Sequence, residues 1–345
     1  MDDFELHDCP RVIDHVRVRG RPFLAGSESR YFPMWIPVMD GARLTIRAHG
    51  SRGTANDAAQ RCRFLVDAHL MSYGSLLFTG LPLRSPDDFE AFMRALDYPK
   101  VSYSGGIAVR PRGAGRTMPA SLEDQRVTLS PHNEMAYLRR FPAKIFFFCA
   151  REAPEGGEVA LKDAGDALSQ IPEAIATPFL QAGIRYVRNL PLESDAIRIG
   201  WPEVFETRER REVEAQLQAD GCDYTWNADG ALTYSYRRPA CIPHPFRSEN
   251  LWFNQVTELH ASYWRHHPLC AAREATDSAF PATTTYGDGR PIDADVITYL
   301  RAMLWQNSSA MKLHAGDVLV LDNLTVQHGR FPFWGPRQHL VSIAS

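Results

Sequence analysis

The sequence predicts a single α+β domain whose core is a β-sandwich or barrel. Three observations lead to this prediction. Short apolar runs with the composition of buried strands gather around one polar His-x-Glu motif, and helical patterns with capping residues fill the intervals. No internal repeat or low-complexity linker divides the 345 residues, and 44% of them are hydrophobic, which is enough for one large core.

Five segments have the apolar spacing of helices. They are residues 58–71, with Asn56 as the expected N-cap; 85–96; the charged segment 206–221, which ends at Gly221; 257–267; and 293–308, with Asp293 as N-cap. The second has the clearest start. Ser85 is a capping residue, Pro86 fits the first helical position, and Asp88 stands where it completes a capping box.

Strand-like runs occupy residues 74–83, 144–150, 154–163 (a turn and then a strand), 250–256, 317–329 and 337–345. The turn-rich sequence RFPFWGP joins the last two. Residues 109–126 are polar and contain Gly and Pro, which is typical of a mobile loop. Because this loop directly precedes the His-x-Glu motif, we expect it to act as an active-site lid.

Charge and composition exclude several kinds of partner. The net charge is −3 and the isoelectric point is near 6.5, without a polybasic run, so neither nucleic acid nor a membrane is expected as a partner. The N-terminus lacks the apolar segment of a signal peptide, and no apolar stretch is long enough to span a bilayer. The six cysteines form no C-x-x-C pair, which indicates reduced thiols in a cytoplasmic protein.

A candidate metal site begins with His132 and Glu134, in the sequence TLSPHNEMAY. Residues i and i+2 of an extended segment point to the same face, so both side chains could reach one ion. His328, in TVQHGRF, is the third candidate ligand. Two imidazoles and one carboxylate form the facial triad of non-haem Fe(II) oxygenases. Zinc hydrolases also use this ligand set, so the triad alone does not name the metal.

Two arginines follow the distal histidine. Arg330 and Arg337 are separated by FPFWGP, whose prolines and glycine interrupt the strand. His328 can therefore end one strand and Arg337 begin the next, with both side chains facing inward. A guanidinium behind a metal suits a dicarboxylate cosubstrate, because it pairs with the distal carboxylate in a bidentate manner.

From about Tyr103 to the C-terminus the sequence resembles the taurine dioxygenase (TauD/TfdA) superfamily of Fe(II)/2-oxoglutarate oxygenases, and most closely its syringomycin-hydroxylase-like branch. The resemblance is carried by PHNEMAY, IFFFCAREAPEGGEVALKD, WFNQV, TYGDG and GDVLVLDNLTVQHGRFPFWGPR. It implies a clavaminate-synthase-like fold: a double-stranded β-helix (jelly-roll) core with flanking helices. Residues 1–345 would form one oxygenase domain, with 1–100 packing on a metal-bearing core built from 101–345.

The resemblance also assigns residue roles. The family's metal ligands fall on His132, Glu134 and His328, and the arginine that binds 2-oxoglutarate falls on Arg337. The implied cofactors are Fe(II), 2-oxoglutarate and O₂. One departure stands at Val159, where many members have a threonine whose hydroxyl also binds 2-oxoglutarate. Glu134 favours hydroxylation over halogenation, because related halogenases have a small residue in its place.

The implied activity is hydroxylation of an unactivated C–H bond in an amino acid or an amino-acid-derived substrate, free or tethered to a carrier, in natural-product biosynthesis. Desaturation on the same scaffold is one alternative, and a zinc-dependent hydrolase is another. A hydrolase is disfavoured, because no general base stands beside the ligands as in H-E-x-x-H.

Four residues are candidate substrate contacts: Tyr103, Trp252, Asn254 and Arg330. Core packing is an equal alternative for Trp252, and a structural salt bridge for Arg330. Arg110, Arg112 and Arg116 in the expected lid suit an anionic or carrier-bound substrate, although a solvated loop is the simpler interpretation. The sequence RHHP at 265–268 resembles a metal motif but is interpreted as the surface end of a helix.

Overall fold

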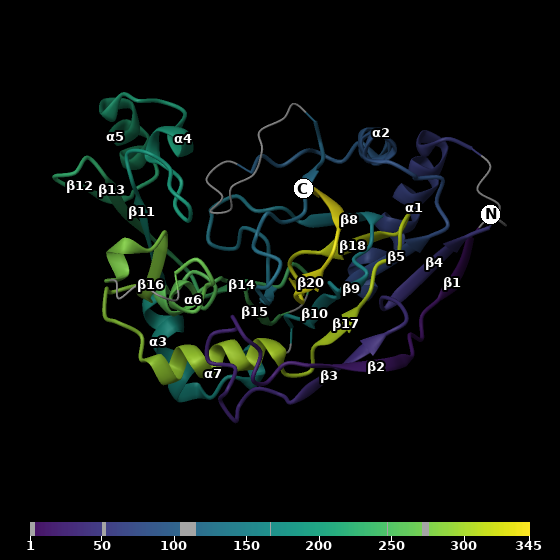
Figure 1. The fold of residues 1–345 in the computed structure, drawn as a ribbon, viewed down its shortest axis with the longest axis horizontal. Coiled ribbons are helices and arrows are strands. Elements are labelled where there is room, and N and C mark those ends of the chain that lie inside the picture. Colours follow the sequence, from purple (N-terminus) through teal and green to yellow (C-terminus); the bar gives the residue numbers. More distant parts are fainter. Residues whose placement is uncertain (1–3, 50–52, 104–114, 166, 247, 271–275) are drawn as a thin grey trace.

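The computed structural model of the protein describes residues 4–49, 53–103, 115–165, 167–246, 248–270 and 276–345. Two large sheets enclose a common apolar core and form a double-stranded β-helix, which confirms the predicted jelly-roll fold (Figure 1). The seven-stranded sheet has the order β1 (Phe4–His7), β4 (Leu44–Ala48), β5 (Ser75–Thr79), β18 (Val318–Asp322), β8 (Lys144–Arg151), β21 (Gln338–Ala344) and β6 (Met118–Pro119). The six-stranded sheet has the order β2 (Val12–Arg17), β3 (Trp35–Met39), β17 (Ser309–Met311), β10 (Val159–Asp163), β19 (Val326–Arg330) and β7 (Leu129–His132).

Strand β8 shows how the seven-stranded sheet is buried on both faces. Phe146 and Phe148 point outward into a cluster formed with helices α1 (Ala55–Tyr73) and α2 (Pro86–Leu96). Ile145 and Phe147 point to the opposite face, into the core between the two sheets. Because neighbouring side chains of a strand alternate between faces, a strand covered on both sides is apolar throughout. This explains the uninterrupted run IFFFCA.

The two helices on this sheet begin with capping boxes. In α2 the Ser85 and Asp88 side chains each accept a hydrogen bond from the other residue's backbone N–H, as the sequence predicts. In α1 the N-cap is Thr54, paired with Asp57, so the prediction of Asn56 was wrong. Thr-x-x-Asp satisfies two orphan N–H groups at once, and this stabilises an earlier start than the apolar spacing suggested.

The first hundred residues supply strands to both large sheets. Strands β1, β4 and β5 belong to the seven-stranded sheet, and β2 and β3 to the six-stranded sheet. Two of the pairings are parallel, β4 with β5 and β3 with β17. This segment therefore completes the core sheets as well as packing on them. The expectation of one domain over the whole chain stays a prediction.

A third sheet is inserted between β10 and β17, and the strand predictions did not include it. Its order is β12 (Asp223–Trp226), β13 (Leu232–Arg238), β11 (Ile184–Leu190) and β16 (Ala282–Tyr286). It lies with α4 (Trp201–Phe205) and α5 (Arg210–Ala219) at the end of the molecule opposite α1 and α2 (Figure 1). Helices α3 (Glu173–Ala182) and α7 (Ala294–Trp305) complete this region, with α6 (Ala261–Arg265), the hairpin β14 (Cys241–Pro243)–β15 (Asn250–Trp252) and the 3₁₀ helices Leu168–Gln170 and Asp277–Ala279.

Helix α7 joins the inserted sheet to the jelly-roll. Ile297 and Leu300 pack in the cluster around the inserted sheet, whereas Ala302 and Trp305 pack with residues of β3, β10 and β17. The helix follows Asp293 as predicted, although the Asp293 side chain makes no capping bond. One helix with two apolar faces thus fixes the inserted sheet against the core.

The predicted strand 317–329 is two strands, because a turn interrupts it. The Asp322 carboxylate accepts hydrogen bonds from the Leu324 N–H and the Thr325 hydroxyl, at 3.0 and 2.8 Å. Such a local bond competes with sheet pairing and reverses the chain. β18 therefore lies in one large sheet and β19 in the other. The strand and helix predicted over 250–267 are also shorter than expected, being β15 and α6.

The expected lid falls partly outside the described residues. Arg110 and Arg112 are among those that the structure leaves undescribed, whereas residues 115–126 are placed. The Glu90 carboxylate accepts hydrogen bonds from the N–H groups of Arg116 and Thr117 at 2.9 Å. The placed part of this loop is therefore anchored to α2.

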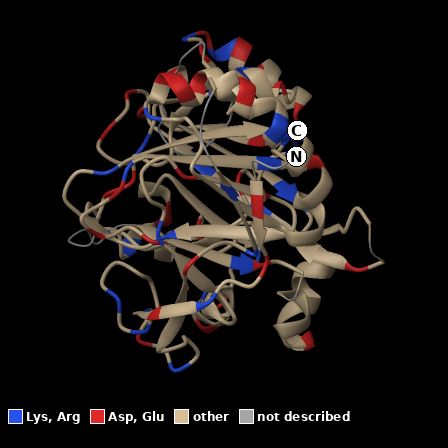
Figure 2. Cartoon of the chain, turned by 90° about the vertical axis from the view of Figure 1, so that its right-hand side faces the viewer, with Lys and Arg blue, Asp and Glu red and all other residues tan. Residues whose placement is uncertain are grey.

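Charged residues of both signs are interspersed over helices and loops in the view of Figure 2, in keeping with the net charge of −3. Within the described residues, no helix is long and apolar enough to cross a membrane.

Candidate functional site: a metal-binding triad in a cavity with two buried arginines

A cavity of about 480 Å³ opens beside strands β7 and β19. Its lining brings together the three candidate ligands, both candidate arginines and residues from the segments 120–124, 195–197, 255–269 and 337–339. Segments far apart in the sequence thus converge on one space, as in a ligand site at the mouth of a β-barrel.

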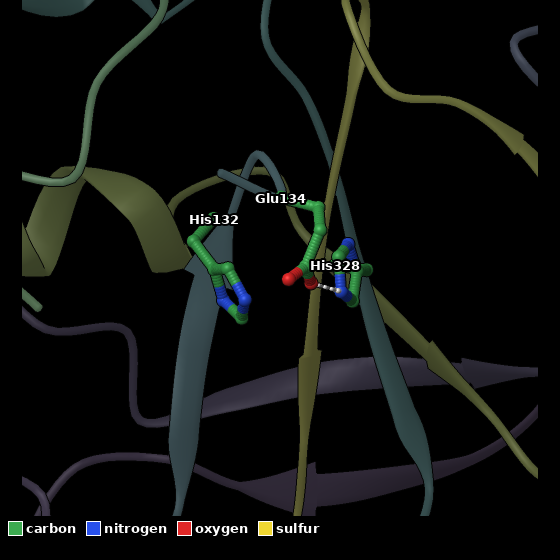
Figure 3. Close-up of side chains that lie close together, drawn as sticks. All are labelled: His132, Glu134 and His328. Atoms are coloured by element: carbon green, nitrogen blue, oxygen red, sulfur yellow. Dashed lines mark ion pairs between the residues drawn. The ribbon is translucent and has the colours of Figure 1, made fainter. Parts of the chain in front are cut away.

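His132 and His328 face each other across an antiparallel strand pair. His132 ends β7 and is the register partner of His328 on β19, and the two ring centroids are 4.6 Å apart. Directly opposed residues are the closest neighbours in a sheet, so this register fixes two ligand atoms on one side. Glu134 follows just past the strand end and points into the same space (Figure 3).

The three side chains form a group that could hold one metal ion. Their ligand atoms all lie within 4.8 Å of one another, and Glu134 Oε2 is 3.7 Å from His328 Nε2. Ligands of one ion stand about 2.0–2.2 Å from it. The ligand atoms are slightly farther apart than they would be around one bound ion, and small side-chain rotations would bring them to the required distance. Two imidazoles and one carboxylate are the donor set of a non-haem iron site with open positions.

The tautomer of His132 suits metal binding through Nε2. Its Nδ1 lies 2.9 Å from the carbonyl oxygen of Ser130. Because a carbonyl oxygen only accepts, Nδ1 carries the proton and Nε2 keeps its lone pair. A backbone carbonyl is a common second partner for a metal-binding histidine, since it fixes both tautomer and ring orientation.

Asn323, in the turn between β18 and β19, fixes the backbone at Glu134. Its Oδ1 accepts the Glu134 N–H at 2.7 Å, and its Nδ2 donates to the carbonyls of Glu134 and Pro142 at 3.0 and 2.8 Å. Asn133 donates to the Asn323 carbonyl in return, at 2.6 Å. Gln255 and Gln327 extend this buried network by donating to Asn133. The Asn323 side chain uses its acceptor and both amide protons, so it holds the His-x-Glu turn rigidly.

Gly329 permits the close strand contact next to His328. A Cβ added at this residue would lie 2.3 Å from the Leu129 carbonyl oxygen and 3.0 Å from the Pro131 nitrogen. Any side chain would therefore push β19 away from β7. The register also shifts directly after His328, so that Arg330 pairs with Leu129. A bulge of this kind redirects a side chain, here towards the cavity.

Arg330 and Arg337 both line the cavity and lie on the Phe333 ring, with guanidinium carbons 5.0 and 5.1 Å from its centroid. Arg330 donates to the carbonyls of Asp124 and Val127, and Arg337 donates to Nδ1 of His339. Neither makes an ion pair with another described residue, and the Nε of each is buried without a partner. Burial and the adjacent Arg330 lower the pKa of Arg337 to about 10, so it is still charged at neutral pH. The nearby carboxylates of Glu123 and Asp124 partly offset the charge of Arg330, so Arg337 is the cation that best fits an anionic ligand.

The candidate substrate residues fall into two groups. Tyr103 and Arg330 line the cavity. Trp252 packs edge-on against Phe179, with ring centroids 5.6 Å apart, and the Asn254 amide bonds the Ala240 carbonyl and the Val256 N–H. Neither lines the cavity: Trp252 packs in the core, which is the alternative given for it above, and Asn254 holds the backbone.

The histidines of RHHP are also placed differently from the prediction. His266 is exposed, as expected, but His267 is 4% exposed and lines the cavity. Its Nε2 lies 2.7 Å from Glu123 Oε1, and the Tyr263 hydroxyl donates to the other oxygen at 3.0 Å. A helix of only five residues ends before His267, so the chain turns this side chain inward.

Sequence reasoning missed Asn323, His339 and Glu258. Asn323 stands in LDNLT, where Asp-Asn signals a turn, but its long-range partner Glu134 leaves no local mark. His339 occupies an inward position of the last strand, and a lone polar residue in QHLVSIA was the available signal. Glu258 lines the cavity from a segment predicted to be helical, whose turn geometry the sequence did not reveal.

Comparison with known proteins identifies the family. The family described as "Taurine catabolism dioxygenase TauD, TfdA family" matches residues 48–344. The chain belongs to this family. It is a non-haem Fe(II)- and 2-oxoglutarate-dependent dioxygenase, as the resemblance implied. The triad and the cationic end of the cavity fit both cofactors, and nothing in the comparison supports a zinc hydrolase.

Two curated relatives have similar length. "Dapdiamide synthesis protein DdaC" of Enterobacter agglomerans is 31% identical over 81% of this chain and 84% of its own. "Clavaminate synthase-like protein At3g21360" of Arabidopsis thaliana is 32% identical over 81% of this chain and 83% of its own. The crystal structure of PvcB from Pseudomonas aeruginosa covers 89% of this chain and 87% of its own with 14% identity and a TM-score of 0.47, which is too distant to add to the assignment.

Replacing Asn323 by Ala should weaken both the fold and the metal site. The change removes the hydrogen bonds of Asn323 to the Glu134 N–H and to two carbonyls, which costs about 2–3 kcal/mol of unfolding free energy. Loss of such an outer partner also weakens metal binding about 10–100-fold. Denaturant unfolding and anaerobic equilibrium dialysis with Fe(II) measure the two effects. Asn56→Ala, an exposed change on α1, is the matched control; unchanged Fe(II) affinity in Asn323→Ala would show that the network does not position Glu134.

Proposed function

We propose that His132, Glu134 and His328 bind Fe(II), that Arg337 binds the distal carboxylate of 2-oxoglutarate, and that the enzyme hydroxylates an unactivated C–H bond of an amino acid or amino-acid-derived substrate. The observation that carries this proposal is the composition of one cavity. An iron-type ligand set and two buried arginines without ion-pair partners among the described residues line the same 480 Å³ space.

Iron and 2-oxoglutarate supply the oxidising chemistry, in which O₂ is consumed and succinate and CO₂ are released. The protein's own contribution is to position the metal ligands and the cosubstrate and to exclude water from the cavity. The β7–β19 register and the Asn323 network fix the ligand side chains. Arg337 orients the cosubstrate from one end, and Leu129, Ile197 and Leu259 are apolar lining residues that limit access of water.

A role in natural-product biosynthesis is supported by the relative whose name includes dapdiamide synthesis. The cavity volume is in the range of small-molecule sites, and suits a free amino acid or the end of a carrier-tethered one. A direct test incubates the enzyme with Fe(II), 2-oxoglutarate, ascorbate and a pool of candidate substrates. Mass spectrometry then distinguishes hydroxylation, a gain of one oxygen, from desaturation, a loss of two hydrogens.

Glu258 supports an amine-bearing substrate. It lines the cavity, and burial raises the pKa of its carboxyl. The other acidic lining residues outside the triad have ion-pair partners: Glu123 with His267, Asp124 with Arg126, and Asp195 with Arg198. Glu258 has no such pair with a described residue, because nearby Arg301 directs its donors to Thr257, Ser262 and Ala25. A substrate ammonium group would supply the missing charge.

Glu134→Ala should abolish substrate oxidation while preserving the fold. The change removes a ligand atom from the triad, and the Asn323 contacts to the backbone at this position survive it. Succinate release is expected to fall at least about 100-fold, because the variant loses a group that the reaction requires. Thermal unfolding checks the fold, and Glu155→Ala, an exposed position, is the control. Full turnover in Glu134→Ala would contradict the triad.

Arg337→Ala should raise the KM for 2-oxoglutarate about thirty-fold or more, because loss of one partner of a buried charge pair costs about 2–5 kcal/mol. Arg337→Lys should rescue poorly, since an ammonium lacks the planar fork of the guanidinium. Arg330→Ala is the comparison, because Arg330 lines the same cavity but donates to two carbonyls. A large effect of Arg330→Ala with little effect of Arg337→Ala would assign the cosubstrate to Arg330.

Glu258→Gln should raise the KM for the organic substrate about ten-fold or more, with the KM for 2-oxoglutarate nearly unchanged, because the neutral amide keeps the size of the side chain but loses the charged pair. The twenty common L-amino acids and their N-acetyl forms, assayed by succinate release, are suitable probes. Free amines are expected to react and N-acetyl forms to fail. Efficient oxidation of an N-acetyl form would remove the case for Glu258 as the ammonium site.

A further inference from the structure

The cosubstrate end of the cavity lacks a hydroxyl where the family resemblance predicts one. Val159 lines the cavity and is buried, so an apolar side chain occupies the position of the expected threonine. The same segment lies beside Arg337, because a Cβ added at Gly157 would be 3.4 Å from Arg337 Nε. A carboxylate bound by Arg337 therefore needs another donor for its remaining lone pairs.

We propose that His339 provides this donor, through a hydrogen bond from its Nε2–H to the distal carboxylate of 2-oxoglutarate. The inference rests on the proposed role of Arg337 and identifies a specificity-determining residue for the same site.

The position of His339 places it in the cavity beside Arg337. It lies on β21, where Leu340 faces the helices while Val341 and Ile343 face the core between the sheets. By strand alternation His339 shares the inward face with Val341. It is 7% exposed and lines the cavity together with Val159 and Arg337.

The hydrogen bond between Arg337 and His339 determines where the imidazole proton lies. Arg337 Nη2 and His339 Nδ1 are 2.7 Å apart. A guanidinium has only donors, so Nδ1 must accept and the ring proton is on Nε2. Burial, together with the positive charges of Arg337 and Arg330, lowers the pKa of His339 to about 3. The ring is therefore neutral at neutral pH and presents one N–H, for which no described residue is a partner.

A purely structural role for His339 has different consequences. As a support for Arg337 alone, it would also act on ligands that carry the distal carboxylate, but a hydroxyl at residue 159 would not compensate for its loss. As a donor to the distal carboxylate, it would affect only ligands that carry this carboxylate, and a hydroxyl at residue 159 would replace it.

Calorimetric titration of anaerobic, Fe(II)-loaded protein separates the two roles. The probes are 2-oxoglutarate and 2-oxovalerate, which has a methyl group in place of the distal carboxylate. His339→Leu should weaken 2-oxoglutarate binding about ten-fold or more, the usual effect of losing a hydrogen bond to a charged group, and should change 2-oxovalerate binding by less than about two-fold. His339→Gln, which keeps an acceptor for Arg337 and an N–H donor, should stay within about three-fold of the wild type.

The decisive variant is Val159→Thr in the His339→Leu background, which should recover most of the lost 2-oxoglutarate affinity. Val159→Thr alone should change little, so the two effects are non-additive, as expected for groups serving one ligand atom. Equal losses for both probes, or no recovery when Val159→Thr is added in a folded double variant, would overturn the proposal. Failure of the wild type to bind 2-oxoglutarate would instead contradict the proposed function, and thermal unfolding of each variant checks its fold.

Discussion

The antiparallel pairing of β7 with β19 is the constraint on which the site depends. It sets His132 directly opposite His328, so the distance between two candidate ligands is a property of the sheet rather than of flexible side chains. The pairing is tight enough to require glycine at 329, and its register shifts immediately afterwards. The same few residues therefore fix two imidazoles and turn Arg330 towards the cavity. A site on paired strands is held more precisely than one on loops.

Glu134 lies beyond the strand, where sheet pairing no longer fixes the backbone. The chain uses buried amides there instead. Asn323 replaces the missing strand partner by bonding both backbone groups of Glu134, and Gln255 and Gln327 donate to the neighbouring Asn133. Buried polar groups are costly unless they are hydrogen-bonded, and these amides offset the cost by bonding one another and the backbone. The turn that carries Asn323 is also the point where the chain passes from one sheet to the other, so the crossover and the site are stabilised together.

The parts of the molecule that the sequence predicts well are those with local causes. The two-residue spacing of His132 and Glu134 predicts that they converge, although Glu134 lies past the end of β7, and Ser85 with Asp88 defines the start of α2. The remaining features leave no mark in the apolar pattern. Asp322 ends a strand through short-range bonds of its own side chain, and the core position of Trp252 on β15 depends on its partner Phe179 from helix α3. The inserted sheet escaped prediction because a strand such as IRYVRNL carries two arginines and resembles an exposed segment.

The cavity carries basic residues at one place and, at another, an acidic residue that has no ion pair within the described residues, and this difference in charge separates two kinds of ligand. Burial and the nearby charge of Arg330 lower the pKa of Arg337, yet Arg337 makes no ion pair with a described carboxylate, whereas Glu123 and Asp124 partly offset the charge of Arg330. A protein that needed Arg337 only for stability would pair it with an acid, since unpaired buried charges are unfavourable. The unpaired Arg337 is explained where an anionic ligand completes the arrangement. Glu258 is an acidic residue in the same cavity that makes no ion pair with a described residue. An anionic cosubstrate would therefore bind at Arg337 and a cationic substrate at Glu258, and like charges would disfavour the reverse arrangement.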